Sequence, residues 1–93
     1  MRRAARTDAN HTEVVKALRR IGASVVSLAS VGAGIPDILC GHNGLNWLFE
    51  VKNPEQPPSK RRLTDDEQAF MIAWRGQYAV VETAEQAIAL VTA

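Results

Sequence analysis

The sequence predicts an α/β fold, a four-stranded mixed sheet flanked by helices in the order αβββαβα. Three observations predict it: helical spacing of apolar residues near the N-terminus, two apolar runs around an Asn-Gly pair, and helix and strand patterns alternating after residue 64. The 93 residues, 46% of them hydrophobic and 23% charged, suit one folded domain, which we assign to residues 1–93.

The first helix is expected to begin at Thr7 or Asp8, either of which can cap it, and to end at Ile21. Apolar residues recur within it at the spacing of one helical face, and Gly22 provides a stop. Residues 24–28 are short and β-branched, so they are predicted to form a strand, followed by a flexible loop of small residues.

Residues 36–40 and 47–52 are predicted to pair as a hairpin, because Asn43 and Gly44 between them both tolerate positive φ. Residues 53–63 (NPEQPPSKRRL) carry three prolines, which we expect to exclude helix and interior strand. This segment is therefore predicted to be an extended, exposed and basic connection.

A T-x-x-E capping box at Thr64 opens a predicted helix that Gly76 ends. Residues 78–81 form the fourth predicted strand, and a T-x-x-Q box at Thr83 opens the last helix. The helix between the third and fourth strands spans enough chain to make these two strands parallel.

The hairpin places two acids opposite each other. With Asn43 and Gly44 at the turn, cross-strand partners have positions that sum to 87, so Asp37 faces Glu50. Lys52 lies on the same face as Glu50, because side chains alternate along a strand. Apolar neighbours on both faces lead us to expect helices over both, which would shield these charges.

Directly opposed side chains have Cβ atoms about 4.5–5.5 Å apart, a separation at which two carboxylates repel each other. The two acids must therefore share a proton or hold a cation between them. Mg²⁺ suits such a place, because it takes one or two carboxylates and leaves positions for water and phosphate oxygens. In the alternative interpretation, Glu50 and Lys52 are an exposed pair on an edge strand and Asp37 is a turn residue after Pro36.

The formal net charge is only +1, but the basic residues cluster. Such clusters can be solvated surface or can contact phosphates. We predict phosphate contacts from the N-terminal cluster and from the proline-rich connection, namely from Arg2, Arg3, Arg6, Lys60, Arg61 and Arg62.

Several classes of protein are excluded. No apolar run is long enough to cross a bilayer and no signal sequence is evident, so we expect a cytoplasmic protein without a membrane partner. The single cysteine, Cys40, cannot form an internal disulfide. No glycine fingerprint indicates a nucleotide cofactor, and no nucleophile with its base indicates a covalent intermediate.

The segments IPDILCG and WLFEVKNP together resemble the signature of the PD-(D/E)XK nuclease superfamily, which has a restriction-endonuclease-like core. The size of the chain and the order of its elements are similar to the stand-alone VRR-NUC (virus-type replication-repair nuclease) branch, often encoded by phages and prophages. The likeness extends from Glu13 to about Val81.

The resemblance implies roles for particular residues. Asp37 and Glu50 would be catalytic acids that bind Mg²⁺ or Mn²⁺, and Lys52 would orient the attacking water or stabilise charge. The Val51 carbonyl would complete the metal shell. The likeness also implies two outlying residues, Glu13 as an additional helical metal ligand and Gln68 as a catalytic side chain, although each is also compatible with an ordinary exposed helix position.

The implied function is metal-dependent endonuclease cleavage of DNA, selective for branched, flap or junction structures such as Holliday junctions. The likeness also implies a role in DNA repair and a homodimer. Two alternatives stay open: a non-cleaving DNA-binding accessory protein with a nuclease-like fold, and a protein-interaction module. A nuclease would cleave DNA when metal is present, whereas an accessory protein would bind DNA without cleaving it. An interaction module would show no DNA affinity that weakens with added salt.

Overall fold

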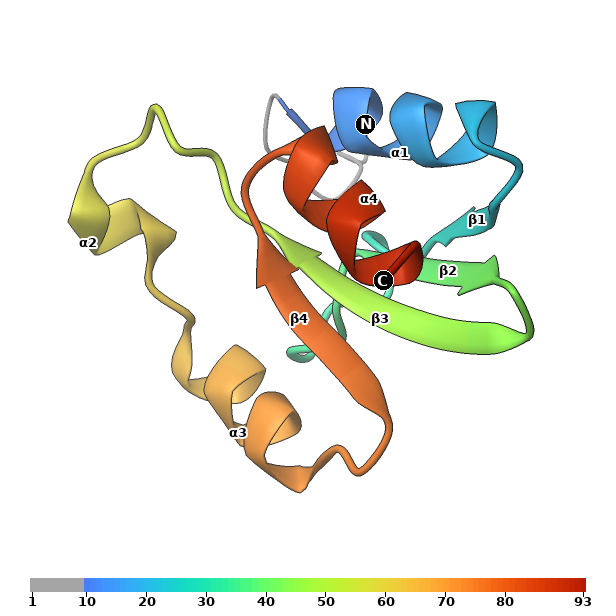
Figure 1. Ribbon diagram of the computed structural model, residues 1–93. Coiled ribbons are helices and arrows are strands. Elements are labelled where there is room, and N and C mark those ends of the chain that lie inside the picture. Colours follow the sequence, from blue (N-terminus) through green and yellow to red (C-terminus); the bar gives the residue numbers. More distant parts are fainter. Residues whose placement is uncertain (1–9) are drawn as a thin grey trace, which may run out of the picture.

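A four-stranded sheet forms the centre of the computed structural model, which describes residues 10–93 (Figure 1). The strands are β1 (Ser24–Ser27), β2 (Ile38–His42), β3 (Leu45–Val51) and β4 (Gln77–Val81), and they lie side by side in this order. The first two pairings are antiparallel, and β4 runs parallel to β3. The predicted mixed sheet and its topology are confirmed.

The turn between β2 and β3 fixes the register of the hairpin. Asn43 and Gly44 have φ values of 53° and 79°, the left-handed conformation that a two-residue hairpin turn of this kind requires. Cys40 consequently pairs with Trp47, as the sequence predicts. The hairpin therefore presents its side chains on the predicted faces.

Two helices, α1 (His11–Arg20) and α4 (Ala84–Val91), lie side by side over one face of the sheet (Figure 1). Val14 and Leu18 of α1 are fully buried there and belong to the same core as Phe49 of β3. Apolar burial of this kind contributes about 1.5–3 kcal/mol for each large side chain. This layer anchors β3, the strand that carries Glu50.

Helix α1 begins at His11, and Asn10 is its N-cap residue. The predicted start at Thr7 or Asp8 lies outside the described residues. The Asn10 side chain makes no capping hydrogen bond; it donates instead to the carbonyl oxygens of Lys52 and Glu82, at 3.0 and 2.6 Å. Asn10 thus joins the start of α1 to the ends of β3 and β4.

The crossover between β3 and β4 contains two helices, α2 (Pro58–Arg61) and α3 (Asp65–Ala73). The prediction that prolines exclude helix from this segment was wrong. Pro58 occupies the first position of the one-turn α2, where its missing N–H has no intrahelical partner to lose. The predicted capping box at the start of α3 is confirmed, with Thr64 and Glu67 bonded reciprocally.

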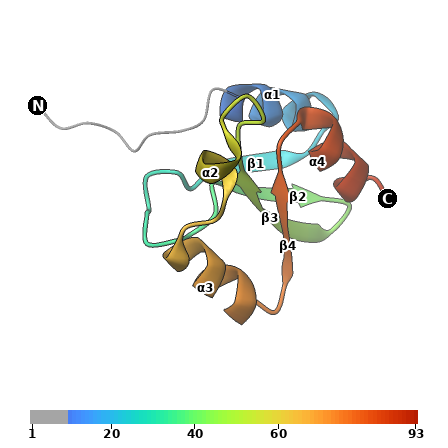
Figure 2. The same ribbon diagram turned by 90° about the vertical axis from the view of Figure 1, so that its left-hand side faces the viewer.

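The second face of the sheet is only partly covered, whereas the sequence led us to expect helices over both faces. Helix α3 buries none of its own residues completely, and Val26 and Val80 remain 52% and 41% exposed. The loop between β1 and β2 reaches the start of α3, where Gly34 meets Asp66 (Figure 2). Within residues 10–93, no helix has the length and apolar character needed to span a bilayer.

Candidate active site

The two predicted acids lie at the end of the β2–β3 hairpin opposite its turn. Glu50 belongs to β3, and Asp37 directly precedes β2, next to the last pair of the register, Ile38 with Phe49. The Asp37 Oδ2 atom accepts a hydrogen bond of 2.7 Å from the backbone N–H of Val51. The Asp37 carboxylate is thereby fixed against β3, beside Glu50.

Glu50 is 3% exposed, and its Oε1 atom has no hydrogen-bond partner among residues 10–93. Burial, and then the negative charges of Asp37 and Glu67, raise the pKa of Glu50 to about 9. Burial also raises the pKa of Asp37, although the Val51 amide favours its charged form. The raised pKa values mean that the two carboxylates are not stable side by side when both are ionised. A pair of this kind is expected to hold a proton or a cation.

The donor set fits a hard divalent cation. A buried carboxylate oxygen without a donor, next to a second carboxylate, offers the ligands that Mg²⁺ and Mn²⁺ accept. No group of three or more His, Cys, Asp or Glu side chains in residues 10–93 could hold a metal ion. A cation bound here would therefore complete its shell with backbone carbonyl, water or substrate oxygens.

Lys52 lies beside this pair, as the alternation of side chains predicts. Its Nζ atom is 3.8 Å from Glu50 Oε2 and 2.9 Å from Glu67 Oε1, and the residue is 8% exposed. Glu67 Oε1 also accepts a 2.9 Å hydrogen bond from the backbone N–H of Thr64. Although burial opposes it, these hydrogen bonds from Thr64 and Lys52 lower the pKa of Glu67.

The other predicted site residues occupy different positions. Val51 is buried and contributes its N–H to Asp37. Glu13 is exposed on α1 and lines a hollow with Asn53 and Glu55, to which neither Asp37 nor Glu50 contributes. Gln68 is exposed in the first turn of α3, where its backbone N–H bonds to Thr64.

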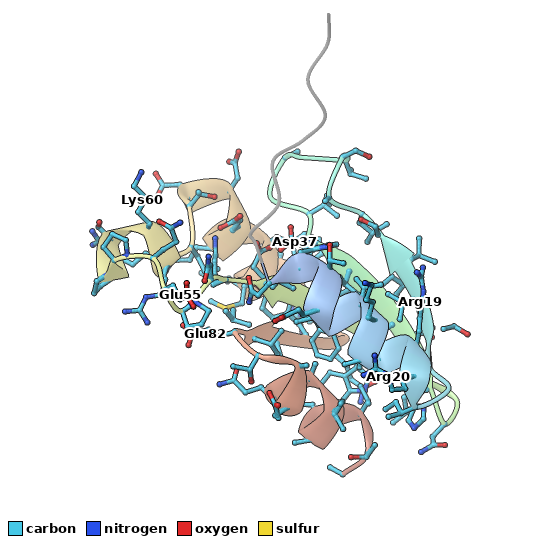
Figure 3. The ribbon with its side chains drawn as sticks, turned by 90° about the horizontal axis from the view of Figure 1, so that it is seen from above. Arg19, Arg20, Asp37, Glu55, Lys60 and Glu82 are labelled. Carbon is cyan, nitrogen blue, oxygen red and sulfur yellow. The ribbon has the colours of Figure 1, made fainter. Side chains whose placement is uncertain are left out.

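The predicted phosphate-binding residues differ in their surroundings. Lys60 projects from α2 (Figure 3), and Arg62 is also exposed. Arg61 lies 3.5 Å from Glu82 as an ion pair, so part of its charge is already balanced. The three N-terminal arginines at positions 2, 3 and 6 lie outside the described residues.

Three residues near the acids were not assigned to the site from the sequence. Glu67 was attributed to the capping box alone, which explained it fully. His11 is buried at the start of α1, and its charge lowers the pKa of Asp37. Tyr78 has a buried hydroxyl group in the field of Glu50, Glu67 and Asp37. No local sequence signal marks Tyr78, because a parallel crossover leaves the register of β4 undetermined.

Comparison with solved structures identifies the architecture. The chain superimposes on a structure described as a "VRR_NUC domain" with a TM-score of 0.58, over 91% of this chain and 97% of the other. The protein has the VRR_NUC fold. The two sequences are 24% identical, and this likeness speaks for the fold alone. No protein-family model matches the sequence, and no curated protein matches it either.

The VRR_NUC fold accounts for the placement of the acids. The hairpin turn sets Asp37, just before β2, beside Glu50, near the end of β3, and the crossover that follows carries Glu67 back to Lys52. The fold expected from the family resemblance is confirmed in this respect.

Proposed function

We propose that this VRR_NUC-fold protein is a metal-dependent deoxyribonuclease that hydrolyses phosphodiester bonds, with a preference for branched, flap or junction DNA. The observation that carries the proposal is the pairing of half-buried Asp37 with buried Glu50, in which Glu50 retains a buried oxygen without a donor among residues 10–93. A neighbouring ammonium, Lys52, completes the combination of charges that phosphate hydrolysis needs.

Asp37 and Glu50 would hold a Mg²⁺ or Mn²⁺ ion, together with the main-chain carbonyl of Val51. A divalent ion at this position supplies Lewis-acid chemistry, polarising the phosphate and lowering the pKa of water. The Val51 N–H keeps Asp37 in place, and burial of Glu50 and Lys52 strengthens every charge interaction around the substrate. Glu13 and Gln68 remain candidates for outer positions that a bound substrate would have to reach.

Lys52 has the geometry of a charge-stabilising residue. Its Nζ atom is held 2.9 Å from Glu67 and 3.8 Å from Glu50, so the ammonium cannot swing freely into solvent. A fixed positive charge beside the acids favours the negative charge that grows on the phosphate during hydrolysis. We assign this role to Lys52 and the role of holding its side chain to Glu67.

DNA would be bound through its backbone. Lys60 and Arg62 are exposed on and next to α2, in the crossover that also leads to Lys52's partner Glu67. Arginine and lysine contacts to phosphates position DNA without reading its sequence. This supports selection by DNA shape, with the N-terminal arginines as additional phosphate contacts.

A homodimer is part of the proposal. Helix α3 and its C-cap residue expose apolar side chains, with Ile72 72% and Trp74 45% accessible, and Val80 of the edge strand β4 is 41% accessible. Exposed apolar residues that cluster on one side mark interaction surfaces. Light scattering at several protein concentrations tests for a dimer, and a monomer at all of them would remove this part of the proposal.

The decisive experiment compares the wild type with Asp37→Asn on a panel of linear, flapped, four-way and single-stranded DNA. We expect the wild type to cleave at least one branched substrate with Mg²⁺ or Mn²⁺ and not with chelator. Asp37→Asn should abolish cleavage and retain DNA affinity, whereas the matched control Asp66→Asn should cleave normally. If the wild type binds DNA yet cuts no substrate with either metal, the protein is a non-cleaving accessory factor instead.

A further inference from the structure

The hydroxyl group of Tyr78 is a buried polar atom that the site described above does not use. It is buried, and no residue between 10 and 93 hydrogen-bonds to it. A buried hydroxyl without a partner costs about 1–3 kcal/mol, so its retention requires an explanation. A contact made only when substrate is present is one such explanation.

The sheet register places Tyr78 on the face that carries the acids. Tyr78 of β4 pairs with Leu48 of β3, and the next pair on the same face joins Val80 to Glu50. Paired residues of neighbouring strands point to the same side of a sheet, so the phenol ring stands beside the column that contains Glu50. Its position is set by backbone pairing and does not depend on a mobile loop.

The ring is also held from the side of α3. Phe70 of α3 lies with its ring centroid 6.2 Å from that of Tyr78, and Glu67 precedes Phe70 by one helical turn. The phenol therefore lies between the sheet and the helix face that bears Lys52's partner.

The electrostatic surroundings keep the phenol protonated. Burial, and then the charges of Glu50, Glu67 and Asp37, raise the pKa of Tyr78 to about 12. A protonated phenol is a hydrogen-bond donor at any physiological pH. The three carboxylates that produce this effect are also the groups around which a substrate phosphate would be held.

We propose that the Tyr78 hydroxyl donates a hydrogen bond to a non-bridging oxygen of the scissile phosphate at the Asp37–Glu50 pair. This inference rests on the proposed nuclease function and adds a residue to it. An incoming phosphate brings oxygens that need donors, and Tyr78 supplies one in addition to the Lys52 ammonium. Donors fixed before substrate arrives stabilise growing negative charge without rearranging during the reaction.

The test is Tyr78→Phe, which removes one oxygen atom and keeps the ring. We expect the single-turnover cleavage rate with saturating Mg²⁺ and DNA to fall about tenfold to a hundredfold, as for the loss of one hydrogen bond to a charged group. DNA affinity in chelator should be unchanged. The melting temperature should stay level or rise, because the variant no longer buries an unpaired hydroxyl.

Trp47→Phe is the matched control, since it alters an aromatic ring stacked on Phe49 on the opposite face of the sheet and leaves the Tyr78 hydroxyl in place. This control should cleave at the wild-type rate. The proposal is overturned if Tyr78→Phe cleaves as fast as an active wild type, which leaves the nuclease function intact. It is also overturned if Tyr78→Phe melts at a lower temperature, because the hydroxyl then has a structural partner. A wild type without cleavage overturns both proposals.

Discussion

The raised pKa of Glu50 makes the stability of the metal-free protein depend on pH in an unusual direction. In the folded chain Glu50 keeps its proton up to a pKa of about 9, whereas the ordinary value is 4.5. Between these values unfolding releases a proton, so the folded state is favoured at low pH and loses stability as pH rises. Most carboxylates in proteins act in the opposite sense.

The size of the effect follows from linkage. One proton released on unfolding changes the free energy of unfolding by about 1.4 kcal/mol for each pH unit. Raising the pH from about 5.5 to 7.5 should therefore cost the wild type about 3 kcal/mol, or roughly 10–20 °C in melting temperature for a domain of this size. Glu50→Gln, which cannot ionise, should remove about that much of the pH dependence.

Urea unfolding followed by tryptophan fluorescence, in chelator and at several pH values across this window, measures these free energies. Mg²⁺ or Mn²⁺ should restore stability most at the upper end, because only the ionised acids bind the ion and binding displaces the proton. The reasoning is refuted if metal-free wild type is equally stable or more stable at high pH. It is also refuted if Glu50→Gln shows the same slope as the wild type.

Three further predictions concern the surroundings of the site. Gly34→Ala should destabilise the fold by about 1–3 kcal/mol in urea titrations, because φ is +81° there and a Cβ atom would collide with the start of α3. Glu67→Ala should lower the melting temperature more than Glu67→Gln, since glutamine can still close the capping box; equal losses would show that the box contributes nothing. The double variant Lys60→Ala/Arg62→Ala should weaken DNA binding, measured by fluorescence anisotropy. The slope of log K against the logarithm of the salt concentration should become less steep by about 1–2. The exposed Arg75, changed to alanine, is the control that should bind DNA as the wild type does.

Local chemistry made the hairpin predictable. Asn43 and Gly44 permit one tight turn, that turn fixes the register of β2 against β3, and the register alone determines that Asp37 and Glu50 are neighbours. Each step depends on residues close together in the chain. The capping box of α3 was predictable for the same reason, because its hydrogen bonds join residues three apart.

Features that depend on distant contacts were not predictable in this way. Glu67 reaches Lys52 across 15 positions, and the position of Tyr78 beside Glu50 follows from a parallel pairing that no turn specifies. The one-turn helix α2 was missed because proline was treated as a helix breaker, although it is favoured at the first helical position.

The crossover between β3 and β4 has a consequence for how this scaffold can diversify. It carries Lys60 and Arg62 on its outside, while the ion pairs of Lys52 with Glu67 and of Arg61 with Glu82 fasten it to the rest of the molecule. Insertions or deletions at residues 53–57, before the first of its helices, would leave the hairpin register and the Asp37–Glu50 pair untouched. The length and surface charge of the crossover can therefore change while the arrangement of Asp37 and Glu50 is kept.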